Sequence, residues 1–117
     1  MKNIIRLEEL AMFGMSIYLL SELHVEWWWY FILVLGPDIG MLGYLGGNKI
    51  GAVTYNLLHH KGIALAIFVA GCLMPDHWMQ IIGITLFGHS SMDRFFGYGL
   101  KTGEGFKYTH LGIIGKN

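Results

Sequence analysis

Charged residues are scarce in this chain. They make up 14% of its 117 residues, against about 25% in typical soluble domains. Positive and negative side chains balance at 8 each, and because no basic block interleaves with aromatic residues, a nucleic-acid partner is excluded. With 54% hydrophobic residues, the composition indicates a single domain, residues 1–117, embedded in a membrane.

Cysteine is almost absent as well. The lone Cys72 excludes an intrachain disulfide, and its apolar surroundings predict a small buried packing residue. A cleaved signal peptide is not expected, because Glu8 and Glu9 precede the first apolar run and no small-residue cleavage site follows before Glu22. The sequence also lacks the H-E-x-x-H, nucleophile-elbow, P-loop and paired C-x-x-C motifs.

Long apolar runs separated by short polar connectors predict an all-α, polytopic membrane protein with about four transmembrane helices in an antiparallel bundle. The expected spans are residues 4–21, 27–46, 50–74 and 78–100, followed by a cytoplasmic tail, residues 101–117. Lys and Arg gather on the side of the two termini, so the positive-inside rule places both termini in the cytoplasm. Charges in the first turns of span 4–21 leave open that it lies at the interface instead.

Two of the spans are interrupted near mid-membrane. In span 27–46, Pro37 lacks an amide hydrogen, which frees a carbonyl of the preceding turn and predicts a kink. Span 50–74 contains a polar run at residues 59–62, so it is either one tilted helix or two short helices broken at Gly62. Glycines at positions 36, 40, 43 and 47 predict close helix contacts.

Ionisable side chains from three spans fall at a common depth. Asp38, His59 and His89 each lie ten to twelve residues into their spans, at about 1.5 Å per residue. Asp93 lies one turn beyond His89 on the same helix face. Charges at this depth normally face the bundle interior and pair with one another, so we expect one shared pocket. His59 and His60 point about 100° apart, so at most one of them faces it.

Nitrogen and oxygen ligands in this combination suit a divalent metal such as Zn²⁺ or Mn²⁺. The predicted metal ligands are Asp38, His59, His89 and Asp93. We predict catalytic roles for Asp38, His89 and Asp93, and substrate contacts for Arg94, Tyr55 and Asn56. For Arg94 a structural ion pair and an anion or headgroup contact both remain open.

The leading functional hypothesis is metal-assisted hydrolysis of a lipid-derived or small polar substrate at an intramembrane Asp/His site. The first alternative is an accessory or structural subunit of a larger membrane complex, and the second is a proton- or ion-coupled carrier. The expected partners are membrane lipids, together with other membrane subunits or further copies of the chain.

Several sequence blocks resemble a known family. They are Gly36-Pro37-Asp38-Ile39-Gly40-Met41-Leu42-Gly43-Tyr44, Ala52-Val53-Thr54-Tyr55-Asn56-Leu57-Leu58-His59, His89-Ser90-Ser91-Met92-Asp93-Arg94-Phe95-Phe96-Gly97-Tyr98-Gly99-Leu100-Lys101, and Phe106-Lys107-Tyr108-Thr109-His110-Leu111-Gly112. In this order they are similar to the small bacterial integral membrane proteins grouped as domain of unknown function 4260. The resemblance implies an inner-membrane location and no particular activity. The last block is expected to cap the cytoplasmic mouth, where a folded-back His110 would reach Asp93 or Arg94.

Overall fold

The computed structural model describes residues 2–97, 100–101, 108–109 and 111–113. The described chain is helical apart from one small hairpin. Its elements are α1 (Lys2–Glu22), α2 (Trp29–Leu35), the 3-10 helix η1 (Gly36–Gly46), α3 (Asn48–His59), α4 (Lys61–Leu73), α5 (His77–Phe95), β1 (Tyr108–Thr109) and β2 (Gly112–Ile113).

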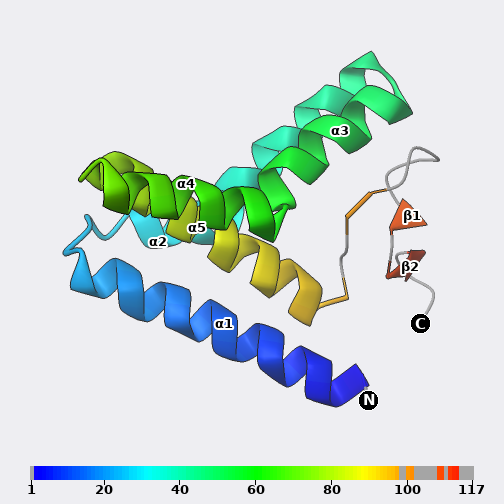
Figure 1. Ribbon diagram of the computed structural model, residues 1–117. Helices are drawn as coiled ribbons and strands as arrows, with labels where there is room; N and C mark the ends of the chain where they lie inside the picture. The colour runs from blue at the N-terminus through cyan, green and yellow to red at the C-terminus, as the bar shows by residue number, and fades with distance from the viewer. Residues whose placement is uncertain (1, 98–99, 102–107, 110, 114–117) are drawn as a thin grey trace.

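The helices form four segments that run back and forth: α1, then α2 with η1, then α3 with α4, then α5 (Figure 1). Helix α5 is central, because α1 packs on one side of it and α4 on another. The apolar core lies where α1, α2 and α5 meet, and its buried residues are Leu20, Leu33, Ile81 and Ile84. The paired helices η1 and α3 extend away from this core (Figure 1).

The kink predicted at Pro37 is present as a change of winding. The α-helical hydrogen bonds of α2 stop at Leu35, and a 3-10 helix continues from Gly36 with the proline in its first turn. An α-helix would place the amide of residue 37 on the carbonyl of Leu33, but proline has no amide hydrogen. The carbonyl of Leu33 is thereby left for a partner from another helix.

The third segment resolves into two helices. Helices α3 and α4 meet at an angle of 46°. The break lies at His60, whose extended backbone ends α3 and whose ring nitrogen accepts a hydrogen bond from the amide of Ile63. The prediction of a break at Gly62 is therefore wrong by two residues, because a histidine N-cap, and not the glycine, ends the run.

Close packing at glycine joins η1 to α3, as predicted for Gly40 and Gly43. A Cβ atom at Gly43 would lie 1.9 Å from Thr54 Oγ1, so only glycine fits there. The same threonine hydroxyl donates a hydrogen bond of 2.6 Å to the carbonyl of Gly40. This contact fixes η1, and with it Asp38, against the helix that carries His59.

The last predicted span ends early. Helix α5 stops at Phe95, not near residue 100, and Gly97 follows with φ of +90°, a conformation that side chains with a Cβ disfavour. Beyond this turn Lys101 forms an antiparallel bridge with Thr109, and β1 pairs with β2. The all-α prediction is therefore confirmed, with this small hairpin as an addition to it, and His110 lies outside the described residues.

Helix α1 is attached to α4 by an ion pair that the sequence did not suggest. The ammonium group of Lys61 contacts the Glu9 carboxylate, and both side chains are largely buried. The Sδ atom of Met12, one turn from Glu9, lies 3.2 Å from the same ammonium nitrogen. Lys61 is thus occupied by α1 and is not the partner of Asp38.

Cys72 is exposed, which corrects the prediction of a buried packing residue. Helix α4 faces its neighbours through Ala64 and Gly71, and a Cβ atom at Gly71 would lie 2.7 Å from the backbone of α5 at Gln80. The next residue along a helix points about 100° away. Cys72 therefore faces outward.

One helical stretch of the described chain, Trp29–Gly46, is long and apolar enough to cross a membrane. The bent pair α3 and α4 meets the same criterion only if the two helices count as one span, and α1 and α5 do not meet it. Charged or polar residues within α1 and α5 lower their mean hydropathy. The predicted helical bundle is thus confirmed, whereas four membrane crossings are not confirmed.

Candidate metal centre

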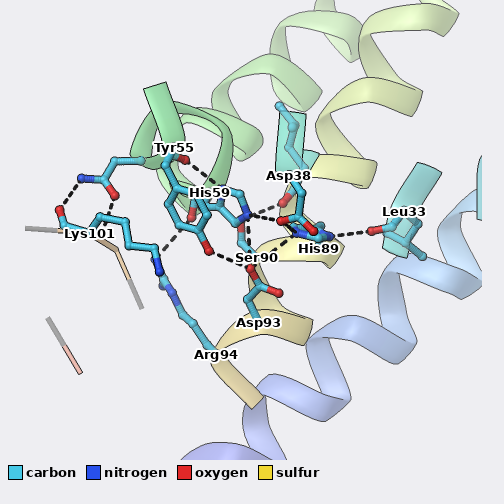
Figure 2. Close-up of polar contacts among 11 residues, drawn as sticks. Leu33, Asp38, Tyr55, His59, His89, Ser90, Asp93, Arg94 and Lys101 are labelled. Atoms are coloured by element: carbon cyan, nitrogen blue, oxygen red, sulfur yellow. Dashed lines mark hydrogen bonds and ion pairs between the residues drawn. The ribbon is translucent and has the colours of Figure 1, made fainter. Parts of the chain in front are cut away.

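Four ionisable side chains converge where three segments meet. Asp38 lies in the first turn of η1, His59 is the last residue of α3, and His89 and Asp93 lie one turn apart on α5 (Figure 2). Each offers one ligand atom, and the four atoms lie within 4.8 Å of one another. The predicted convergence is confirmed, with His59 and not His60 as the histidine that faces the site.

The four distances from histidine nitrogen to carboxylate oxygen have the size of the edges of a metal coordination polyhedron. His89 Nε2 lies 3.0 Å from Asp38 Oδ1 and 3.5 Å from Asp93 Oδ2. His59 Nε2 lies 3.4 Å and 3.2 Å from the same two oxygens. A tetrahedral ion with bonds of about 2.0–2.1 Å has edges of about 3.3–3.4 Å.

Both histidine rings are held by their other nitrogen. His89 Nδ1 lies 3.0 Å from the carbonyl of Leu33, the group that Pro37 leaves without its helical donor. His59 Nδ1 lies 2.8 Å from the carbonyl of Tyr55, one turn earlier on α3. A carbonyl can only accept, so each Nδ1 carries a hydrogen. Metal-binding histidines are typically oriented by this kind of backbone contact.

This tautomer leaves the Nε2 atoms of both neutral rings as acceptors aimed at carboxylate oxygens. Acceptors this close repel each other unless a cation, either a proton or a metal ion, lies between them. His59 Nε2 is buried and has no hydrogen-bond partner. The four ligand atoms are therefore placed to share one cation.

The four ligands differ in their exposure to the surroundings. His59, His89 and Asp93 are buried, whereas the side chain of Asp38 is 39% exposed. Buried carboxylates without a partner are costly, and Asp93 has one in the hydroxyl of Tyr55, which donates to Oδ2 over 3.1 Å. Access to the cluster from outside therefore passes Asp38.

Tyr55 supports the cluster from α3. Its ring stacks on the His59 ring with centroids 3.8 Å apart and planes 6° apart. The ammonium group of Lys101 lies 4.6 Å from the centre of the Tyr55 ring, and Figure 2 shows Tyr55 between Lys101 and His59. Tyr55, predicted as a substrate contact, thus orients two of the ligands.

The side chain of Asn56 turns away from the cluster and toward the chain that follows α5. Its amide nitrogen donates 2.7 Å to the carbonyl of Lys101, and its oxygen accepts from the amide of Lys101. These two hydrogen bonds hold Lys101 beside Tyr55. Burial lowers the pKa of Lys101, while the carboxylates of Asp93 and Asp38 oppose that shift.

Arg94 lies at the same edge of the cluster. Its Nη2 is 3.5 Å from the carbonyl of His59, a long contact. That carbonyl is available because the amide of Ile63, its helical donor, bonds to His60 instead. Arg94 therefore borders the cluster through the backbone of a ligand residue.

Lys101 was missed by sequence reasoning, which assigned it to the cytoplasmic tail, residues 101–117. The local signal was Gly97, a residue suited to reversing the chain after α5. That glycine indicates a turn but not its direction, so the contact of Lys101 with Tyr55 follows only from the folded structure.

Comparison with known proteins adds a family. The family model described as "Domain of unknown function (DUF4260)" matches residues 2–114. The chain belongs to this family. The DUF4260 match spans all four clustered residues together with Tyr55, Arg94 and Lys101. No curated protein and no solved structure matches the chain. The family description states no activity, so the function is argued from the site.

Proposed function

We propose that this DUF4260 protein is a membrane-embedded hydrolase. Its metal centre binds one divalent ion, Zn²⁺, which serves the hydrolysis. The observation that carries the proposal is the set of two histidines held by Nδ1 to backbone carbonyls, with Nε2 facing two carboxylates at 3.0–3.5 Å. Imidazole nitrogen and carboxylate oxygen together suit zinc better than magnesium or calcium.

The three buried residues, His59, His89 and Asp93, form the permanent ligand set. Two histidines and one carboxylate are a common set in catalytic zinc sites, which leave a further position for water or substrate. Asp38, the more exposed member, borders that position. We assign Asp38 as the exchangeable ligand and the general base.

A zinc ion in this site would polarise the substrate and make a water molecule more acidic. The protein's own residues supply the rest. Asp38 accepts the proton that the attacking water loses, because its carboxylate borders both ligand histidines. Tyr55 keeps Asp93 pointing inward through its hydroxyl. Leu33 keeps His89 in one orientation through its carbonyl.

The distribution of polar and apolar residues supports a membrane setting. Large apolar side chains are exposed on every helix, including Leu45 at 90%, whereas much of the buried set is polar. Soluble proteins rarely expose apolar surface on this scale. Trp27, Trp28 and Trp78 are exposed, and the rings of Trp28 and Trp78 both lie beside Trp29, as expected for an interfacial aromatic belt.

We extend this to four membrane crossings, one for each helical segment, with both termini in the cytoplasm of a bacterial inner membrane. The 21 residues of α1 are about 31 Å long, which matches the hydrocarbon thickness. Its charged residue Glu9 is neutralised by Lys61 of α4. Membrane lipids are then the immediate surroundings and the source of substrate.

An accessory subunit and an ion-coupled carrier were the alternative hypotheses. An accessory role would use the polar residues as a sealed hydrogen-bonded cluster. His59 Nε2 faces two carboxylate oxygens without a hydrogen bond, and the Asp38 side chain is 39% exposed. Both observations favour a ligand-binding site over a sealed cluster. The carrier hypothesis stays a prediction, with no observation that favours it.

The test is the metal content of purified protein. Wild type exchanged into zinc and freed of excess should retain about one equivalent, as a single four-ligand site requires. His89→Gln should retain almost none, because the side chain of glutamine cannot replace a ring held between Leu33 and Asp38. The matched control is His60→Gln, whose exposed ring caps α4 outside the cluster and should leave the zinc content unchanged. Equal retention by both variants would refute the proposal.

A further inference from the structure

An apolar pocket of about 170 Å³ lies beside the metal centre. Its lining includes Pro37 and Leu58, which immediately precede the ligands Asp38 and His59 in the sequence. Trp29 and Ile39 complete the side formed by α2 and η1. Binding pockets built mainly from apolar side chains take apolar parts of ligands, so this pocket suits a hydrocarbon chain.

Cationic side chains border the cluster at another edge. The guanidinium of Arg94 reaches the carbonyl of His59, and the ammonium of Lys101 covers the outer face of Tyr55. Figure 2 shows both side chains extending along the Tyr55 side of the cluster. Arginine and lysine placed together are the usual partners of phosphate groups.

The pocket lining, the metal ligands and Arg94 follow one another along the axis of helix α5. Ile82, Thr85 and Leu86 line the pocket, His89 and Asp93 are metal ligands, and Arg94 follows. At 1.5 Å per residue the axial distance from Thr85 to Arg94 is about 14 Å. The metal centre thus lies between an apolar pocket and a cationic edge. An amphipathic molecule could place its apolar part in the pocket and an anionic group at the cationic edge.

We propose that the substrate is a lipid phosphate ester, whose phosphate binds Arg94 and Lys101 next to the metal centre and whose hydrocarbon chain occupies the apolar pocket. The inference rests on the proposed hydrolytic function and names its substrate class. We infer that this ester is a lipid of the surrounding membrane, because both the pocket and the exposed helix faces are apolar.

Hydrolysis of such an ester balances without a further reactant. The oxygen of one water molecule forms a bond to phosphorus while the bond from phosphorus to the lipid oxygen breaks. One water proton, taken up by Asp38, ends on the departing lipid alcohol, and the other stays on the released phosphate. The metal centre and the Arg94 edge both stabilise negative charge on the phosphate oxygens.

The experiment measures binding by thermal stabilisation of zinc-loaded protein in a neutral detergent, with three probes: octyl phosphate, octanol and inorganic phosphate. Octyl phosphate carries both halves of the proposed ligand, so it should reach half-maximal stabilisation at a concentration at least about tenfold below that of either other probe. Similar midpoints for octyl phosphate and octanol would overturn the phosphate assignment. Similar midpoints for octyl phosphate and inorganic phosphate would overturn the lipid assignment.

Two variants separate the two halves of the site. Arg94→Gln should raise the octyl phosphate midpoint about tenfold and leave that of octanol unchanged, and Arg94→Lys should recover part of the loss. Ile39→Asn, at an exposed position of the pocket lining, should weaken octyl phosphate and octanol but not inorganic phosphate. The matched controls are Lys49→Gln and Leu45→Asn, which are exposed positions outside the pocket and the cluster.

The failure of this inference is distinguishable from failure of the proposed function. If wild type retains zinc but Arg94→Gln binds octyl phosphate as wild type does, the substrate class is wrong and the metal centre stands. If wild type retains no zinc, the proposed function is wrong, and preserved Arg94-dependent binding of octyl phosphate to the metal-free protein would still support the substrate class.

Discussion

Zinc should stabilise the wild-type protein and fail to stabilise Asp93→Asn. At a zinc concentration 100 times the Kd, binding adds about 2.7 kcal/mol to the free energy of unfolding. That corresponds to a rise in Tm of very roughly 10 °C or more at this chain length. Asparagine still accepts the Tyr55 hydroxyl but lacks the anion, so a Kd weakened about a hundredfold would leave about 0.4 kcal/mol at the same zinc concentration.

Asp38→Asn is the matched comparison for Asp93→Asn. Asp38 is the exposed ligand, and three buried ligands remain when it is changed. A tenfold loss of affinity would keep about 1.4 kcal/mol of the zinc effect. Circular dichroism melts in detergent, with zinc and with chelator, measure all three proteins. A larger loss for Asp38→Asn than for Asp93→Asn would contradict the assignment of Asp93 to the permanent ligand set.

Lys61→Met should destabilise the protein by about 3–5 kcal/mol, because it leaves the buried Glu9 carboxylate without its partner. The double variant Glu9→Gln with Lys61→Met removes both charges and should recover most of that loss. This ion pair joins α1 to α4, so in Lys61→Met we expect α1 to detach from the bundle before the other helices unfold.

The control for Lys61→Met is Lys49→Met, which changes an exposed lysine at the start of α3. Its effect should stay within about 0.5 kcal/mol. Denaturant-induced unfolding in detergent micelles, followed by tryptophan fluorescence, measures the four proteins side by side. Equal effects of the two single variants would show that the Glu9–Lys61 contact contributes nothing to stability.

The convergence of the metal-ligand candidates was predictable because it depends on depth along each span. Counting residues places Asp38, His59 and His89 at one level, and ionisable groups in apolar surroundings must face one another. The carbonyl freed by Pro37 was predictable for the same reason, since a proline always lacks its amide hydrogen. Its use by His89 was not, because that contact depends on how α5 packs against α2.

Other features depend on contacts between residues far apart in the chain. Glu9 and Lys61 are paired only because α1 and α4 both pack against α5, which no local pattern specifies. The break between α3 and α4 falls at His60 because its ring caps the next helix. Gly62, two residues later, was an equally plausible position for the break from the sequence alone. The burial of Lys101 follows from the reversal after α5 and the two hydrogen bonds to Asn56.

The most direct test of the metal centre is X-ray absorption spectroscopy at the zinc edge of the loaded protein. We predict nitrogen and oxygen ligands at about 2.0–2.1 Å, with the outer scattering of two imidazole rings from His59 and His89. A shell of six oxygens without imidazole scattering, or a sulfur ligand at about 2.3 Å, would contradict the assignment of Asp38, His59, His89 and Asp93 as a metal site.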